Sequence, residues 1–114
     1  MTQAFVALGS NLANPIRQVQ NALAALERIP RTHVVRASSL YQTAPVDSDP
    51  KDLGKAPDFI NAVVELETDL SALELLDALF AIENQAGRER PYRNAPRILD
   101  CDLLLHGSTI VNTE

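Results

Sequence analysis

The chain is poor in cysteine and aromatic residues, and no long apolar run interrupts it. Its 114 residues include one cysteine, Cys101, so an internal disulfide is excluded. There is no tryptophan, and two tyrosines and three phenylalanines leave few platforms on which nucleobases could stack. No apolar stretch approaches the roughly 20 residues of a membrane-spanning helix. The N-terminus, Met1 to Ala4, lacks the basic start and apolar centre of a signal peptide, and we expect a cytoplasmic protein.

Positive charge is scarce, and it is unevenly distributed. The formal net charge is −5 at pH 7, which argues against a nucleic-acid-binding surface. Yet of the ten lysines and arginines, four fall within ten positions: Arg88, Arg90, Arg93 and Arg97. The planar guanidinium fork matches phosphate oxygens, so the cluster indicates a phosphate-binding loop. The alternative is a solvated loop whose arginines pair with acids elsewhere in the protein.

Two aspartates follow this cluster inside an apolar run. Asp100 and Asp102 lie in the stretch Ile98 to Leu105, which has the length and composition of a buried or half-buried strand. Residues two apart on a strand point to the same face, so the two carboxylates emerge side by side, roughly 6–7 Å apart. Cys101 then faces the opposite side, as a core residue. Mg²⁺ bound to a polyphosphate is the simplest group that would neutralise the pair.

Periodicity and turn residues divide the chain into alternating strands and helices. Asn14 is expected to cap a first helix that Pro30 ends, with Pro15 at its first position. Ser71 is expected to cap a second helix through a capping box with Glu74, and Gly87 is its expected C-cap. Strands are predicted over residues 3–8, 32–41, 59–66, 98–105 and 109–112, with long loops over 44–58 and 88–97.

This order predicts one α+β domain over residues 1–114. The sequence strand, helix, strand, strand, helix, strand is typical of a ferredoxin-like two-layer sandwich, with an antiparallel sheet and both helices packed on one face. Such a fold carries many unrelated chemistries, so function has to be argued from the site.

The chain resembles the hydroxymethyldihydropterin pyrophosphokinase family of folate biosynthesis. The likeness rests on an ordered set of motifs that spans the chain. They are Ala7-Leu8-Gly9-Ser10-Asn11-Leu12, Tyr41-Gln42-Thr43-Ala44-Pro45, Pro57-Asp58-Phe59-Ile60-Asn61-Ala62, Ile82-Glu83 with Gly87-Arg88, and Pro96-Arg97-Ile98-Leu99-Asp100-Cys101-Asp102. The resemblance implies transfer of pyrophosphate from ATP to the hydroxymethyl group of a reduced pterin, with release of AMP.

The resemblance also implies roles for individual residues. Asp100 and Asp102 would hold two Mg²⁺ ions, while Arg88 and Arg97 would stabilise charge on the phosphates. Arg90 and Arg93 would be further phosphate or lid contacts, and Glu83 and Leu103 would lie on the nucleotide side. The residues expected to line the pterin site are Gly9, Ser10, Asn11, Thr43, Ala44, Val46, Phe59, Asn61 and Tyr92. The partners are therefore the small molecules ATP and hydroxymethyldihydropterin, and a monomer is expected.

The chain departs from the family pattern in two places. It stops at Glu114, whereas family members continue through a segment with a histidine, an arginine and an aromatic residue, so we expect a C-terminally incomplete domain. In the arginine loop, Tyr92 is the aromatic available where the family carries its stacking residue.

Two alternatives to the enzyme stay open at this point. One is a non-catalytic pterin- or nucleotide-binding module, because the pocket is incomplete. The other is an interaction domain in which the Asp100 and Asp102 carboxylates form ion pairs with the arginine loop.

Overall fold

The computed structural model describes residues 1–11, 14–43, 58–87 and 99–111. Eight elements follow one another in these ranges. They are β1 (Thr2–Ser10), α1 (Pro15–Glu27), β2 (Thr32–Ala37), β3 (Tyr41–Thr43), β4 (Phe59–Thr68), α2 (Ala72–Gly87), β5 (Asp100–His106) and β6 (Thr109–Ile110). The predicted loop at 88–97 lies outside the described residues, as does all of the 44–58 loop except Asp58.

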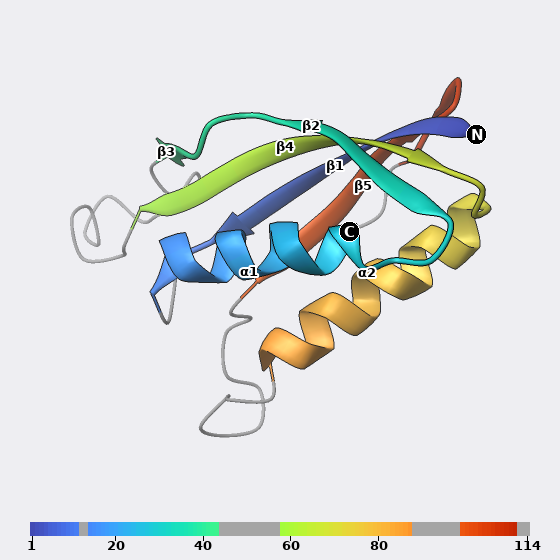
Figure 1. Ribbon diagram of the computed structural model, residues 1–114. Helices are drawn as coiled ribbons and strands as arrows, with labels where there is room; N and C mark the ends of the chain where they lie inside the picture. The colour runs from blue at the N-terminus through green and yellow to red at the C-terminus, as the bar shows by residue number, and fades with distance from the viewer. Residues whose placement is uncertain (12–13, 44–57, 88–98, 112–114) are drawn as a thin grey trace.

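The strands form one antiparallel sheet in the order β2-β4-β1-β5-β6, with β3 paired to the beginning of β4. Figure 1 shows α1 and α2 together beneath one face of this sheet. The predicted α+β, ferredoxin-like arrangement is thereby confirmed. None of the described helices is long and apolar enough to span a membrane.

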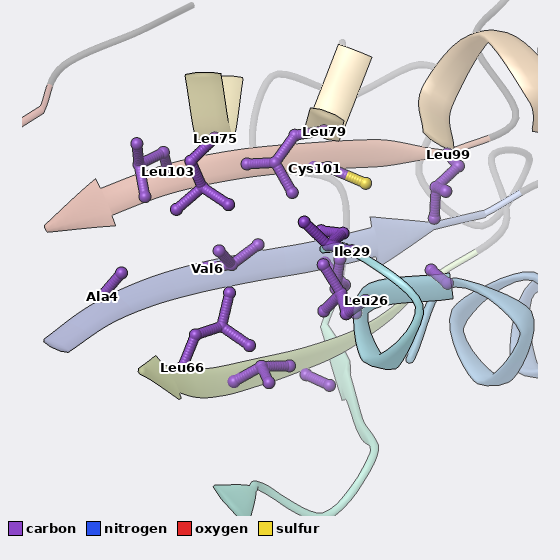
Figure 2. Close-up of a cluster of buried hydrophobic side chains, with 14 of the residues drawn as sticks. Ala4, Val6, Leu26, Ile29, Leu66, Leu75, Leu79, Leu99, Cys101 and Leu103 are labelled. Atoms are coloured by element: carbon purple, nitrogen blue, oxygen red, sulfur yellow. The ribbon is translucent and has the colours of Figure 1, made fainter. Parts of the chain in front are cut away.

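The core lies between the helices and the sheet. Alternate residues of the three central strands are buried there against apolar side chains of both helices, and Figure 2 shows this cluster. The buried members are Ala4, Val6 and Leu8 of β1, Ala62, Val64 and Leu66 of β4, Cys101 and Leu103 of β5, Val19, Ala22 and Leu26 of α1, and Leu75 and Leu79 of α2. Because strand side chains alternate, the residues between these face away from the helices. We call that side of the sheet the far face.

The capping box of α2 is confirmed. The Ser71 hydroxyl accepts a hydrogen bond from the Glu74 backbone N–H (3.1 Å), and the Glu74 carboxylate accepts one from the Ser71 N–H (2.9 Å). These bonds lower the pKa of Glu74 below its usual 4.5, chiefly through the backbone hydrogen bond, and Arg31 adds to the effect. Gly87 is the last residue of the helix rather than a cap beyond it.

Three further sequence predictions need correction. The side chain of Asn14 makes no capping bond, because its backbone is left-handed (φ 62°), although its carbonyl accepts the N–H of Gln18 (3.1 Å). The first strand, predicted over residues 3–8, continues through Gly9 and Ser10 as β1.

The strand predicted over 32–41 is two strands. Its pairing with β4 shifts register between Val34 and Arg36, which marks a β-bulge. Ala37 pairs with Val64 and Tyr41 with Asn61, so the stretch between Ala37 and Tyr41 has one residue more than the matching part of β4. The extra residue interrupts the ladder, and β3 starts as a separate strand.

Candidate active site

The two aspartates occupy the start of β5 and face away from the helices. Cys101, between them, is buried in the core, where Figure 2 draws it among the other buried side chains. Asp100 is half-buried and Asp102 is exposed on the far face. The sequence prediction that the carboxylates share one face, opposite Cys101, is confirmed.

Sheet pairing brings the predicted pterin and metal residues into one line. Asp100 pairs with Gly9, Gly9 pairs with Asn61, and Asn61 pairs with Tyr41. We call these four residues the cross-strand row. Neighbouring strands are about 4.8 Å apart, so the backbone positions of Asp100 and Asn61 are about 10 Å apart across Gly9.

Small residues lie between the two ends of this arrangement. Gly9 separates Asp100 from Asn61, and Ala7 of the same strand lies opposite Asp102. A Cβ atom at Gly9 would lie 3.1 Å from the Asn61 side-chain oxygen, which is closer than nine in ten real contacts. Gly9 therefore leaves room for the Asn61 amide on the far face.

The Asn61 amide is held by three acceptors from β3 and β4. Its Nδ2 group donates to the Thr43 hydroxyl at 2.8 Å and lies 3.4 Å from the Phe59 carbonyl and 3.5 Å from the Tyr41 carbonyl. Thr43, Phe59, Asn61 and Tyr41 consequently share one face, and Phe59 is half-buried there.

Glu83 of α2 binds the backbone at the start of β5. Its Oε2 atom accepts the N–H of Cys101 at 2.8 Å, between the two aspartates. Burial, followed by the charges of Glu83, Asp102 and Asp100, raises the pKa of the Cys101 thiol. Cys101 is therefore a neutral core residue, and Glu83 supports the strand that carries both carboxylates.

The donor chemistry of the pair fits a hard cation. Asp100 and Asp102 offer carboxylate oxygens, the ligands that Mg²⁺ prefers. Among the described residues, no group of three or more His, Cys, Asp and Glu side chains could hold a metal ion. A cation here would take its remaining ligands from water or from a substrate phosphate, as Mg²⁺ commonly does.

Glu65 is another acid of the far face, and it has a structural role. Glu65 forms an ion pair with Arg36 at 3.0 Å and accepts a hydrogen bond from Gln3 at 3.0 Å. Both oxygens of Glu65 therefore bind side chains of the sheet, whereas a cation ligand needs an oxygen that is available to the cation.

The structure separates the remaining predicted site residues into three groups. Leu103 is 1% exposed in the core, on the other side of β5 from the aspartates. Ser10 and Asn11 lie at the end of β1 and directly after it. The predicted residues outside the described part of the chain are Ala44, Val46, Arg88, Arg90, Tyr92, Arg93 and Arg97.

Sequence reasoning missed two neighbours of the site. Tyr41 belongs to the cross-strand row and is 46% exposed, which gives that end of the row an aromatic surface. The sequence could have indicated Tyr41, because it is two residues from Thr43 and residues two apart on a strand share a face. Ala7 had no local signal, because only the pairing with β5 brings it opposite Asp102.

A cavity of about 350 Å³ lies elsewhere, between α1 and α2. Its lining includes Gln18, Asn21, Gln85 and Leu99, so it opens on the helix side of the sheet and not beside the carboxylates. The residues predicted to bind a cation or a pterin ring lie along the cross-strand row and do not line this cavity.

Known proteins resemble the chain over nearly its whole length. The family model described as 7,8-dihydro-6-hydroxymethylpterin-pyrophosphokinase matches residues 5–113. The chain is 46% identical over 114 residues to the 2-amino-4-hydroxy-6-hydroxymethyldihydropteridine pyrophosphokinase of Haemophilus influenzae, covering 100% of this chain and 68% of that protein. It is 48% identical over 110 residues to the protein of the same name from Pseudomonas aeruginosa, covering 96% of this chain and 65% of that protein.

A third relative is much longer. The folic acid synthesis protein fol1 of Schizosaccharomyces pombe is 34% identical over 111 residues, which cover 97% of this chain and 14% of that protein. The chain thus spans about two thirds of the length of the two bacterial relatives and a small part of the yeast one.

Proposed function

Because this chain belongs to the 7,8-dihydro-6-hydroxymethylpterin-pyrophosphokinase family, we propose that it transfers pyrophosphate from ATP to the hydroxymethyl group of 6-hydroxymethyl-7,8-dihydropterin. The products are AMP and the pterin diphosphate, and the reaction is a step of folate biosynthesis. The observation that carries the proposal is the cross-strand row, in which Asp100 and Asn61 flank Gly9 on three adjacent strands.

The two ends of the row suit the two substrates. Asp100 and Asp102 would hold two Mg²⁺ ions together with the triphosphate of ATP. When bound, the metal would supply charge neutralisation and would help to align the triphosphate for in-line attack. Asn61 would bind the pterin ring, Thr43 would line the same pocket, and Phe59 would supply an apolar surface beside the ring. About 10 Å separates the two ends, a span that a bicyclic ring with a hydroxymethyl arm can bridge.

In this mechanism the pterin hydroxyl oxygen attacks the β-phosphorus, and the bond to the α-phosphate oxygen breaks so that AMP leaves. Arg88 and Arg97 would stabilise the charge that develops on the phosphates. Arg90 and Arg93 would add phosphate or lid contacts, and Tyr92 would stack on the pterin. Residues 44–58 and 88–97 would close over both substrates and exclude water, which favours transfer over hydrolysis.

The test is AMP release by this chain with ATP, Mg²⁺ and hydroxymethyldihydropterin, against a control without pterin. We expect AMP formation that depends on both pterin and Mg²⁺. Asp100→Asn and Asp102→Asn should remain folded and lose at least about 99% of the activity, because each removes a metal ligand. Asp77→Asn is the matched control, since it removes one negative charge from an exposed position of α2.

The stability of the same variants separates the enzyme from an interaction domain. Asp100→Asn should leave the apo protein as stable as the parent or more stable, because the repulsion between two neighbouring carboxylates is relieved. If instead Asp100→Asn destabilises the protein strongly and Mg²⁺ changes neither melting temperature nor activity, the carboxylates serve internal ion pairs. A folded chain that binds pterin and MgATP without releasing AMP would be a binding module.

A further inference from the structure

The orientation of the Asn61 amide is determined by chemistry, because its two ends face different partners. The Nδ2 end lies near the carbonyl oxygens of Phe59 and Tyr41, which can only accept hydrogen bonds. The reversed amide would bring its own oxygen against both carbonyls. The NH₂ group must therefore point toward β3 and the start of β4.

Both hydrogens of this NH₂ group are used inside the protein. The Thr43 hydroxyl accepts the short bond at 2.8 Å, while the two carbonyls at 3.4 and 3.5 Å share the other hydrogen. Thr43 thus makes the strongest contact that holds the amide, and it comes from a neighbouring strand rather than from β4 itself.

The opposite end of the amide points along the cross-strand row toward Asp100. Its Oδ1 atom lies over Gly9, 3.1 Å from where a Cβ would stand. No donor from the part of the chain that the structure describes is bonded to this oxygen. What Asn61 offers on the far face is consequently an acceptor and not a donor.

We propose that Thr43 is a positioning residue, which locks the Asn61 amide so that the site selects a ligand edge carrying an N–H donor. The inference rests on the proposed function and sharpens it, since it assigns a hydrogen-bond polarity to the ring-binding end of the site. An amino-pyrimidinone edge, as in a pterin, can donate from its amino group and ring N–H. A pyrimidinedione edge keeps the ring N–H, but a carbonyl replaces the amino group, so Oδ1 loses one of the two donors and meets an acceptor in its place.

The first experiment compares Thr43→Val with Thr43→Ser. Valine has nearly the same shape and no hydroxyl, whereas serine keeps the hydroxyl. We expect Thr43→Val to weaken hydroxymethyldihydropterin binding about tenfold in Kd, as for loss of one hydrogen bond of about 1.4 kcal/mol. MgATP affinity should not change, and Thr43→Ser should bind pterin within about threefold of the parent. Thr109→Val, on the exposed strand β6, is the matched control.

The second measurement concerns polarity. The preference for the pterin over its pyrimidinedione counterpart should fall severalfold in Thr43→Val, because only the two longer contacts, at 3.4 and 3.5 Å, then hold the amide. An unchanged preference, equal losses in Thr43→Val and Thr43→Ser, or equal losses for pterin and MgATP would each overturn the proposal.

A third measurement needs no ligand, so it separates this proposal from the proposed function. In NMR spectra of the parent protein, the Asn61 side-chain NH₂ protons should exchange slowly with water. In Thr43→Val the exchange should be at least several times faster. If the parent binds no pterin but this difference is seen, the proposed function fails while the locked amide stands. If both proteins exchange equally fast, the locked amide is refuted, even where pterin binds.

Discussion

Gly9 is the residue on which the geometry of the candidate site depends most directly. It is the member of the cross-strand row that lies between Asp100 and Asn61, and its missing side chain leaves room for the Asn61 oxygen. The strand backbone there requires no unusual φ, so the reason for glycine is space rather than conformation.

Gly9→Ala is therefore expected to damage pterin binding selectively. The added methyl would meet Asn61 Oδ1 at 3.1 Å, so the amide must shift by a few tenths of an ångström. We expect the Kd for the pterin to rise by about three- to tenfold, a cost of one weakened hydrogen bond, while the Kd for MgATP stays unchanged. Calorimetric titration with each ligand measures both. An unaltered pterin Kd would show that Asn61 Oδ1 does not contact the ligand.

At the scale of elements, the two helices support the site through their contacts with the sheet. α2 carries the capping box at its start and Glu83 in its last turns. Glu83 connects this helix to the backbone of Cys101, between the two aspartates. We therefore expect changes in α2 to affect the backbone that carries both carboxylates.

Glu83 gives a prediction that separates support of β5 from a nucleotide contact. Glu83→Gln keeps an oxygen that can accept the Cys101 N–H, whereas Glu83→Leu leaves this part-buried N–H without its partner. We expect Glu83→Leu to lower the free energy of unfolding by about 1–3 kcal/mol and to raise the Mg²⁺ concentration needed for activity. Glu83→Gln should behave like the parent in urea denaturation and in Mg²⁺ titration of AMP release. A loss of ATP affinity in Glu83→Gln with normal stability would instead support the predicted nucleotide contact.

The capping box of α2 gives a pH-dependent prediction. Ser71→Ala should lower the free energy of unfolding by about 1 kcal/mol at pH 7, because the helix loses its N-cap. The lowered pKa of Glu74 means that its carboxylate is more favourably ionised in the folded state than in the unfolded one. This contribution is present above the ordinary pKa of 4.5 and disappears as the pH falls through the lowered folded value.

Glu74→Gln removes the ionisable carboxylate, so comparing its stability with that of the parent measures what the ionised Glu74 contributes. Its stability deficit relative to the parent should be largest at neutral pH and should vanish in acid well below pH 4.5, as measured by urea denaturation across this range. A deficit that grows on acidification would contradict the sign of the pKa shift.

At the scale of the whole molecule, one core joins β1, β4 and β5, the strands that carry Gly9, Asn61 and the two aspartates. Leu103 belongs to this core and lies next to Asp102 in the chain, but on the helix-covered face. We expect Leu103→Ala to lower the free energy of unfolding by about 2–5 kcal/mol, through lost burial and the cavity left behind. Tyrosine fluorescence and far-UV circular dichroism should report the same urea midpoint, because the domain unfolds as one unit.

Leu103 has either a structural role in the core or the nucleotide-side role that the resemblance implied. The ATP affinity of the folded Leu103→Ala variant decides between these two roles. Unchanged affinity supports a purely structural role. Normal stability with weaker ATP binding would restore the nucleotide-side role that the sequence resemblance implied.

Local sequence patterns were sufficient for the elements and for some contacts within them. The helical periodicity and the capping pair Ser71 and Glu74 predicted α2, and alternation predicted that Cys101 faces away from both aspartates. The division of residues 32–41 into β2 and β3 was not predictable, because the bulge depends on pairing with β4. The left-handed backbone of Asn14 was missed for another reason. Asparagine suits both a capping side chain and a left-handed backbone, so the residue type does not distinguish them.

By itself, then, the sequence determined the element types, the ferredoxin-like order and the family, because periodicity, capping residues and ordered motifs are local properties of the chain. Only the tertiary structure decided that Gly9 lies between Asp100 and Asn61, and that Thr43 holds the Asn61 amide. These residues are far apart in the chain and meet through strand order and register. Register depends on how each strand buries its apolar face against the helices, so it is a property of the assembled core.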